Sequence, residues 1–180
     1  MEKLILVKPS MEYVNEIREY RQEWRENDSH SHGDGGLYRS DGIEEWITKC
    51  RLYESKETLP DPSRVEAEQF MLLREGESRI LGMINFRHYL KGYLAEHGGH
   101  IGYGVRPTER RKGYAKAMLM LCLEKCRAYG LDKVLVTCAP DNEKSRKVII
   151  SCGGKFERLA RTKISENSEE EIDERYWISI

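Results

Sequence analysis

The chain has 180 residues, the size of one ordinary domain, so a single core is expected to stabilise it without a metal or a disulfide. Its 30 basic and 31 acidic residues leave a net charge of −1, which excludes a chain-wide positive field toward nucleic acid or an anionic membrane. The acidic start and the short apolar runs predict neither a signal peptide nor a membrane span, and hence a cytoplasmic location.

The five cysteines predict reduced thiols rather than disulfides. Their number is odd and no pair has the C-x-x-C spacing. Cys122 and Cys126 lie four residues apart, which favours packing on one face of a helix. His30, His32 and Asp34 have a short spacing that could suit a metal, but the surrounding Gly, Ser and Asp residues favour a loop. We therefore expect no metal site.

The first part of the chain predicts one strand and two helices. Apolar residues 4–7 form the strand, and Ser10 is a candidate N-cap for the helix that follows. A second helix is expected over 41–54, with Asp41 as its cap. The apolar stripes of these helices are Tyr13, Val14, Ile17, Tyr20 and Trp24, and then Ile43, Trp46, Ile47 and Cys50. The expected loops are 27–36 and 58–63.

The rest of the chain predicts a run of strands, a strand–helix–strand unit and a closing hairpin. The expected strands are 69–75, 79–90, 100–105, 133–139, 155–162 and 175–180. A long helix is expected over 111–129, ended by Gly130, and a short helix runs to about residue 151. The acidic run 165–174 is expected to be a solvated loop. This order predicts a mixed sheet with helices on both faces and a right-handed crossover between parallel strands within 100–139.

The junction between the strand at 100–105 and the long helix carries the strongest functional signal. Four charged residues, 109–112, end the strand, and Gly113 permits a backbone conformation that a side chain would strain. The first backbone N–H groups of the helix, at about 111–115, have no partner within it. Since these donors and the helix dipole favour negative charge, the sequence predicts a bound phosphate or pyrophosphate. The cations nearest to it are Arg110, Arg111 and Lys112.

Other interpretations of this junction fit less well. Tyr114 and Ala115 follow the glycine, so the pattern is not that of a P-loop. Gly102 and Gly104 stand inside the strand and lack a third glycine, which argues against a dinucleotide-binding turn. A solvated charge cluster remains an alternative, although each cation at a helix start is unfavourable by about 0.3–1 kcal/mol.

Residues 110–115 match R-x-x-G-x-A, and in this the chain resembles the GNAT superfamily of N-acyltransferases, whose acetyl-CoA signature has that form. A strand ending in Val-Arg-Pro at 105–107 precedes the signature, as in the superfamily. Asn142 and Ser145 open the short helix at the matching distance. The similarity covers roughly residues 80–160, and a narrower one is to bacterial predicted acetyltransferases with a run like GGHIGYGVRP-x-ERRKGYA.

This resemblance implies a fold and a cofactor. The fold is α/β, with a mixed, mostly antiparallel sheet of about six to seven strands, a splayed parallel pair, and helices on both faces. The chain, residues 1–180, is then a single N-acetyltransferase domain with its acetyl-CoA core at about 80–160. The cosubstrate is acetyl-CoA, and no metal is implied. The residues assigned to it are Gly104, Val105, Arg110, Arg111, Lys112, Gly113, Tyr114, Ala115, Asn142 and Ser145.

Each group of these residues has an implied role. Backbone amides of about 111–115 cradle the pyrophosphate, and the open edge of the strand ending at Gly104 and Val105 bonds the pantetheine amides. Asn142 bonds the pantetheine arm and Ser145 lies close to the cofactor. Helix capping is the alternative role for these last two residues.

The acid and the base are less clear from the resemblance. Ile149 stands where many members have the tyrosine that protonates the departing thiolate, so Ser145 or a water could serve instead. His100 and Tyr103 are the candidate catalytic residues, with His100 as a proton relay near neutral pH. The alternative for His100 is a histidine that is packed or bonded at a strand end. His88 is a weaker candidate.

The resemblance implies an N-acyltransferase that moves an acetyl group from acetyl-CoA to a primary amine by direct attack. The alternative is a catalytically silent module that binds CoA and regulates a partner; a nucleic-acid module is disfavoured by the charge balance. The acceptor is a small-molecule or protein amine, with no nucleic acid and no membrane as partner. Residues 27–40 are a candidate substrate lid, and an exposed edge at the C-terminal strand is compatible with a homodimer.

Overall fold

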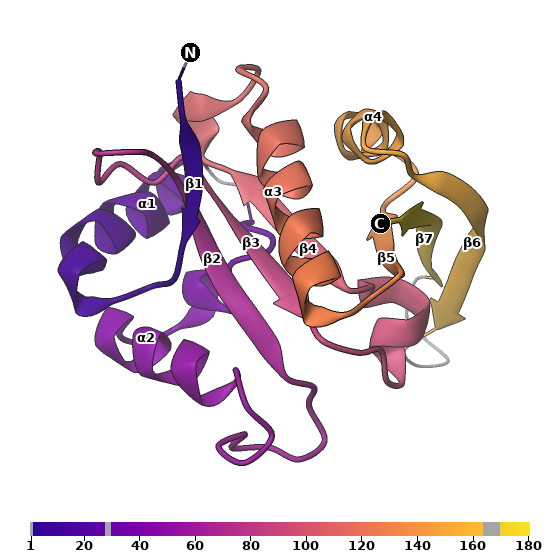
Figure 1. Cartoon of the computed structure of the whole chain (residues 1–180), viewed down its shortest axis with the longest axis horizontal. Helices are drawn as coiled ribbons and strands as arrows, with labels where there is room; N and C mark the ends of the chain where they lie inside the picture. The colour runs from indigo at the N-terminus through magenta and orange to yellow at the C-terminus, as the bar shows by residue number, and fades with distance from the viewer. Residues whose placement is uncertain (1, 28–29, 164–169) are drawn as a thin grey trace.

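The computed structural model describes residues 2–27, 30–163 and 170–180, and in them seven strands form two antiparallel sheets (Figure 1). The strands are β1 (Leu4–Val7), β2 (Ala67–Arg74), β3 (Gly82–Arg87), β4 (Ile101–Val105), β5 (Lys133–Cys138), β6 (Lys155–Lys163) and β7 (Glu170–Ser179). The main helices are α1 (Val14–Glu26), α2 (Ile43–Leu52), α3 (Tyr114–Tyr129) and α4 (Glu143–Ser151), together with a short π-helix, η3 (Leu94–Gly98). No helix in these ranges is apolar over a length that would cross a membrane.

The first sheet has the order β1-β2-β3-β4 and separates two apolar cores. Successive side chains of a strand point to opposite faces, and β2 shows this clearly. Phe70 and Leu72 pack in the core that includes α3, whereas Met71 and Leu73 pack in the core that includes α1 and α2. The predicted stripes of α1 and α2 are the residues that fill this second core. Helices therefore cover both faces of the sheet, as predicted.

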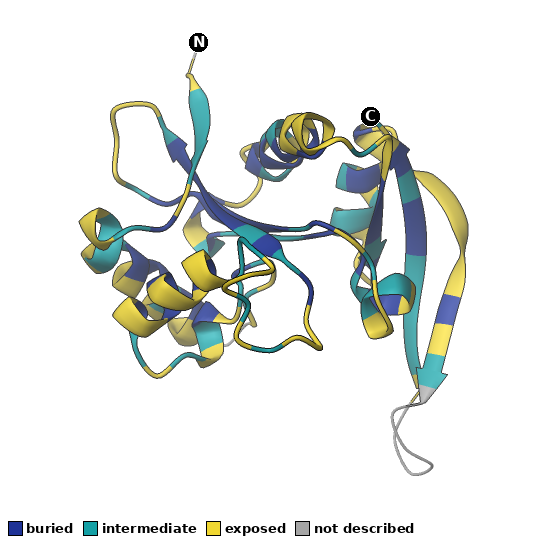
Figure 2. Cartoon of the chain, turned by 60° about the horizontal axis from the view of Figure 1, so that its bottom comes forward, coloured by how far each residue is buried: buried dark blue, intermediate teal, exposed yellow. Residues whose placement is uncertain are grey.

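The second sheet has the order β5-β7-β6. The C-terminal strand β7 is thus the middle strand, and the prediction that it offers an exposed edge is wrong. The edge strands are β5 and β6, and β6 is largely exposed (Figure 2). The prediction of a loop over 165–174 is also wrong for 170–174, which form the start of β7. The remainder of that run lies outside the described residues.

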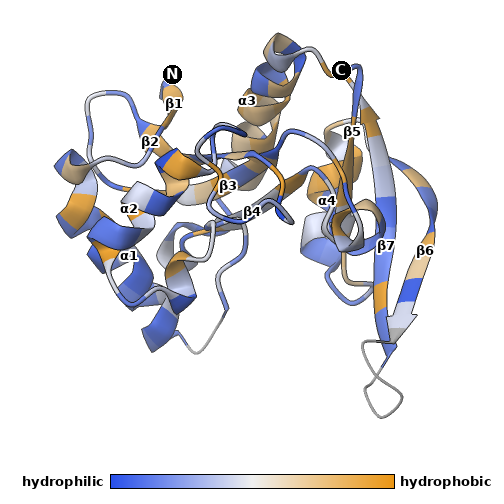
Figure 3. Ribbon diagram, turned by 90° about the horizontal axis from the view of Figure 1, so that it is seen from below, coloured by the Kyte–Doolittle hydropathy of each residue, from blue (hydrophilic) through white to orange (hydrophobic). Residues whose placement is uncertain are grey.

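The two sheets meet at β4 and β5, which are in contact, and Figure 3 shows the first sheet on one side of this junction and the second on the other. The His100 backbone N–H donates to the Leu135 carbonyl at 2.8 Å, and beyond that point the two strands form no ladder. Both strands run in the same direction, because Tyr103 further along β4 reaches Ser145, just after β5. The predicted splayed parallel pair is therefore present, and it divides the strands into two sheets.

Several predicted boundaries need correction. The long helix begins at Tyr114 rather than 111, because Arg111 and Gly113 have positive φ angles of 66° and 86° that no α-helix accommodates. The helix predicted over 41–54 spans Ile43–Leu52, and its N-cap is Gly42 rather than Asp41. Ser10 likewise makes no side-chain cap bond. The strand predicted over 79–90 is confined to β3.

Candidate active site

The turn before α3 presents a row of backbone donors. No residue in the described part of the chain accepts a hydrogen bond from the N–H groups of 111–116, whereas the Ala117 N–H already bonds the Gly113 carbonyl at 3.2 Å. The left-handed angles of Arg111 and Gly113 turn the chain so that these amides lead into the helix. Open space surrounds Gly113, since a Cβ added there would meet no atom within 4 Å. This geometry suits an anion.

The three cations predicted around this turn differ in their surroundings. The Lys112 ammonium pairs with buried Glu109 at 2.8 Å, and the Arg110 guanidinium lies 4.9 Å from the centre of the Trp24 ring. Within the described residues no ion-pair partner is found for Arg111, which is exposed. Although burial opposes ionisation of Glu109, the hydrogen bonds from Lys112 and Arg79 lower its pKa below the usual value. Lys112 is therefore partly committed to holding the turn.

A buried arginine fixes the turn to α1. Arg106 bonds Glu16 and Glu23, each at 2.5 Å, and its side chain is almost fully buried. The other carboxylate oxygen of Glu23 accepts from the backbone N–H and the hydroxyl of Thr108, both at 2.8 Å. Sequence reasoning missed this network, because only the fold brings residues 16 and 23 to residue 106. The one local signal was a charged residue directly after the strand at 100–105.

The outer edge of β4 is open toward the gap between the sheets. In its ladder with β3, only every second residue forms hydrogen bonds. The Arg106 N–H donates to the Leu81 carbonyl and the Arg87 N–H donates to the His100 carbonyl, so the even-numbered residues of 100–106 are the ones that bond β3. The N–H and C=O groups of Tyr103 and Val105 consequently point away from β3. An extended ligand could pair with them as an added strand.

Tyr103 and Ser145 meet across this gap. Their hydroxyl oxygens are 2.8 Å apart, and burial raises the pKa of Tyr103 to about 12, so its phenol stays protonated. The side-chain oxygen of Asn142 accepts from the Ser145 backbone N–H at 3.1 Å, which caps α4. Ile149, at the position of the superfamily's tyrosine, is completely buried in the core.

His100 lies at the point where β4 and β5 separate. Its Nδ1 accepts from the Leu135 backbone N–H at 2.9 Å, and the side chain is buried. Burial, and then the nearby charge of Arg87, lower the pKa of His100 to about 4. His88, the weaker candidate, directly follows β3, and its Nε2 lies 3.4 Å from a carboxylate oxygen of Glu68.

The segment that was a candidate lid lies against β4. A Cβ on Gly104 would come 2.7 Å from the His32 carbonyl oxygen, and a Cβ on Gly33 would collide with the backbone of Gly102. The two glycines of β4 therefore allow the chain at 32–33 to pack directly on the strand. This explains why glycines stand inside a strand without forming a nucleotide-binding turn.

Beside this contact is a cavity of about 1110 Å³. It lies on the sheet face that carries α1 and α2, since its floor includes Gln69, Asn85 and Arg87. Its walls come from the 33–41 and 61–65 segments, from α2, and from residues 91–94. The lining carries both signs of charge. Its acidic residues are Asp34, Asp41, Glu45 and Asp61, and its basic residues are Arg39, Lys49, Arg64, Arg87 and Lys91.

Comparisons with known proteins agree with this arrangement. The model of the acetyltransferase (GNAT) family matches residues 19–153. No curated protein matches the chain. The structure of the microcin C7 self immunity acetyltransferase MccE, in complex with acetyl-CoA and AMP, has a TM-score of 0.72 at 16% identity, covering 100% of this chain and 94% of that one.

Two acetyltransferases that act on ribosomal proteins share the fold as well. The enzyme from Salmonella typhimurium that modifies the N-terminal serine of protein L7/L12 gives a TM-score of 0.69 at 14% identity, covering 98% of this chain and 95% of that one. The ribosomal-protein-S5-alanine acetyltransferase from Vibrio fischeri gives 0.65 at 21% identity, with 98% and 91% covered. Because the family model spans most of its length, the chain belongs to the GNAT family of acetyltransferases.

Proposed function

We propose that the chain transfers the acetyl group of acetyl-CoA to a primary amine by direct attack. The observation that carries this proposal is the row of unbonded N–H groups at 111–116 beside the open edge of β4. The row suits the pyrophosphate, and the open edge at Tyr103 and Val105 suits the pantetheine, whereas the backbone of Gly104 faces β3. Tyr114 and Ala115 contribute their backbone amides, and Arg110 and Arg111 add positive charge. Structures of family members bound to acetyl-CoA support this choice of cosubstrate.

The reaction requires an electrophile held in place and a proton for the leaving thiolate. The Val105 N–H, which points into the gap, is suited to polarise the thioester carbonyl. The paired hydroxyls of Tyr103 and Ser145 are suited to protonate the thiolate in place of the missing tyrosine. Asn142 caps α4 with its oxygen, and its NH₂ group is left to donate to the pantetheine arm.

His100 receives a different role in this proposal. Its Nδ1 already accepts a hydrogen bond and its environment disfavours protonation, so the interpretation as a bonded strand-end histidine fits the geometry better than a proton relay. The acceptor then attacks as the free amine. Its nitrogen becomes positively charged in the attack and loses one proton to water. An α-amino group, with an ordinary pKa of about 7.7–8.0, is partly in that form at neutral pH.

The cavity of about 1110 Å³ is the proposed acceptor site, because it adjoins the 32–36 segment that packs on β4. The related structure of an enzyme that modifies the N-terminal serine of a ribosomal protein makes a peptide α-amine the first acceptor class to test. Small-molecule amines are the second. A peptide panel varied at its first residue, assayed beside small amines for release of the CoA thiol, distinguishes the two classes.

The cofactor site is tested by calorimetric titration of acetyl-CoA into the wild type and Gly113→Ala, with ATP and NAD as control ligands. Gly130→Ala is the matched variant, because Gly130 ends the same helix, also has a positive φ, and has no atom within 4 Å of an added Cβ. We expect selective acetyl-CoA binding that Gly113→Ala weakens and Gly130→Ala leaves unchanged. Equal weakening by both variants would show that backbone strain causes the loss of binding, and it would contradict the proposed cofactor site at Gly113. Binding without thiol release from any amine would favour a silent CoA-binding module.

A further inference from the structure

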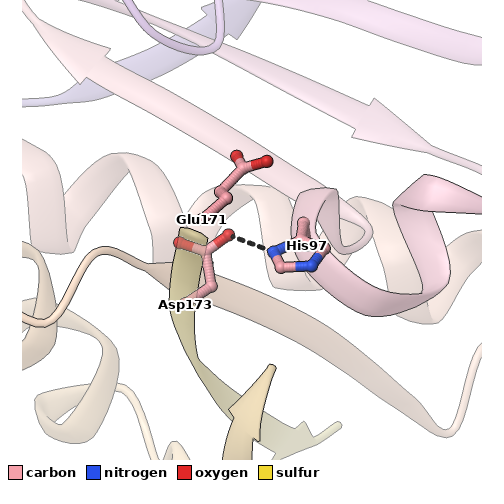
Figure 4. Close-up of side chains that lie close together, drawn as sticks. All are labelled: His97, Glu171 and Asp173. Carbon is pink, nitrogen blue, oxygen red and sulfur yellow. Dashed lines mark hydrogen bonds and ion pairs between the residues drawn. The ribbon is translucent and has the colours of Figure 1, made fainter. Parts of the chain in front are cut away.

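A histidine and two carboxylates converge at the contact between η3 and β7, away from the proposed cofactor site. His97 comes from η3, and Glu171 and Asp173 come from the same face of β7 (Figure 4). One nitrogen or oxygen of each residue lies within 4.8 Å of the others. His97 lies more than seventy positions before the two carboxylates in the sequence, so no spacing pattern could reveal the cluster. Cation sites are formed by such convergence of donor atoms.

His97 is oriented as a ligand through Nδ1. Its side chain is almost completely buried, and its Nε2 is 2.7 Å from the Thr162 hydroxyl oxygen. When Nε2–H donates to that hydroxyl, Nδ1 keeps its lone pair, and Nδ1 is the atom that faces Asp173 Oδ2 at 3.1 Å. A hydrogen bond from the second ring nitrogen is the usual way in which proteins orient a metal-binding histidine.

Glu171 is held with one oxygen free. The Tyr93 hydroxyl donates to Oε1 at 2.5 Å, whereas Oε2 is buried and has no hydrogen-bond partner among the described residues. A buried carboxylate oxygen without a partner is unfavourable by about 1–3 kcal/mol or more. The free oxygen is the one that a cation between the three residues would engage.

The two carboxylates of this cluster are not neutralised by a lysine or arginine within the described residues, which favours a bound cation. In the described part of the chain, neither Glu171 nor Asp173 pairs with a lysine or arginine, and His97 is the one basic group beside them. The nearest arginine of the strand, Arg175, is committed to Glu157 and to the carbonyls of η3.

We propose that His97 Nδ1, Glu171 Oε2 and Asp173 Oδ2 bind a divalent first-row cation of the Zn²⁺ or Mn²⁺ type, with water completing its coordination. One imidazole and two carboxylates suit these ions better than they suit soft Cu(I) or the all-oxygen preference of Ca²⁺. The ion joins η3 to β7. Because Tyr93 and Leu94 line the proposed acceptor cavity, the bound cation also fixes one wall of that cavity.

The test is calorimetric titration of Zn²⁺ into metal-stripped wild type, Glu171→Gln and Glu170→Gln. Glu170 precedes Glu171 on β7 but is exposed and pairs with Arg161, so it is the matched control. We expect one saturable site in the wild type and in Glu170→Gln, and an affinity at least about ten-fold lower in Glu171→Gln, as for other losses in metal-site shells. Zn²⁺ should also raise the thermal midpoint of the first two proteins more than that of the third.

Two results would overturn the proposal. One is no saturable binding to the wild type. The other is equal binding to Glu171→Gln, which would place the ion elsewhere, for example at the exposed His30. Asp173→Asn provides a second ligand variant in case Glu171→Gln fails to fold, and it should weaken binding to a similar extent. Neither result depends on acetyl-CoA or on turnover, so the proposal stands or fails separately from the proposed function.

Discussion

The hydroxyl pair of Tyr103 and Ser145 is the residue-level feature on which the proposed chemistry depends most. The two residues are 42 positions apart, and they meet because β4 and the start of α4 flank the same gap. Burial keeps the phenol protonated, with a pKa of about 12. A donor with this property can protonate a thiolate and then recover its proton from solvent through Ser145.

Tyr103→Phe tests that role. The variant keeps the ring and removes the hydroxyl, so we expect kcat to fall by about 10²-fold or more, the usual contribution of a positioned acid. KM for acetyl-CoA should change little, because none of the proposed contacts to the bound cofactor is made by the Tyr103 hydroxyl. Tyr176→Phe is the control, since Tyr176 is also buried and bonds one carboxylate, Glu174, at 2.9 Å. Equal kcat values for the two variants would show that the Tyr103 hydroxyl transfers no proton.

His100 yields a prediction about pH and stability. Its pKa is lowered to about 4 by burial and by Arg87, from an ordinary value of 6.5, so between these limits the unfolded chain binds a proton that the folded chain does not. Stability must therefore fall as the pH drops through this window. In His100→Asn, the side-chain oxygen can still accept from the Leu135 backbone N–H, but the variant has no imidazole to take up a proton in this pH range. Urea unfolding at several pH values should show a shallower acid loss in the variant; identical slopes would contradict the assigned pKa.

Local residue signals could be read from the sequence, whereas contacts between distant residues could not. Gly113 and Asn142 were identified because a turn glycine and a helix cap act within a few residues of themselves. The partner of Tyr103 and the cluster around His97 depend on which strands lie side by side. No spacing in the sequence encodes that information.

At the level of elements, the turn between β4 and α3 depends on a brace from α1. Arg106 is held between Glu16 and Glu23, and Glu23 also bonds Thr108. The same Glu16 oxygen accepts from the Ile80 backbone N–H at 2.9 Å. One helix thus fixes both the end of β4 and the turn that precedes β3, and through them the row of amide donors.

Arg106→Met should be strongly destabilising, because it leaves two carboxylates in a poorly solvated place without their cation. Removal of one partner from a buried ion pair typically costs about 3–5 kcal/mol. Arg161→Met is the control: its pair with Glu170 is exposed, and such pairs contribute about 0–1 kcal/mol. Urea denaturation of both variants measures the difference. A loss no larger for Arg106→Met than for Arg161→Met would mean that the brace is not structural.

The type of each element was predictable, and its ends were less so. Apolar periodicity located α1, α2 and α3, because it reports which face of a helix is buried. The start of α3 was placed three residues early, since the positive φ of Arg111 is not apparent from the residue type. The start of β7 was missed because its acidic residues resemble a solvated loop. In the structure, however, Glu174 pairs with Arg146 at 2.6 Å, and Asp173 lies 3.1 Å from the His97 ring.

At the level of the whole molecule, the two sheets share one core. Phe70, Leu72 and Ile84 of the first sheet belong to the same apolar cluster as Val134 and Tyr176 of the second. Backbone bonding between the sheets is sparse, with His100 and Leu135 as the contact. The order of elements along the chain predicted the fold class, but the arrangement β5-β7-β6 could not be foreseen, since it rests on pairing between distant strands.

This architecture predicts how the chain unfolds with and without its cosubstrate. Because the core is continuous across both sheets, we expect a single cooperative transition, as for one domain. Acetyl-CoA bound in the gap would contact both sheets and raise that one midpoint, with a stabilisation of about 2.7 kcal/mol at a ligand concentration 100 times Kd. Differential scanning calorimetry of the wild type and Gly113→Ala, each with and without acetyl-CoA, measures this. Two separate transitions, of which the ligand moves one, would show instead that the sheets are independent units and that the cofactor contacts only one of them.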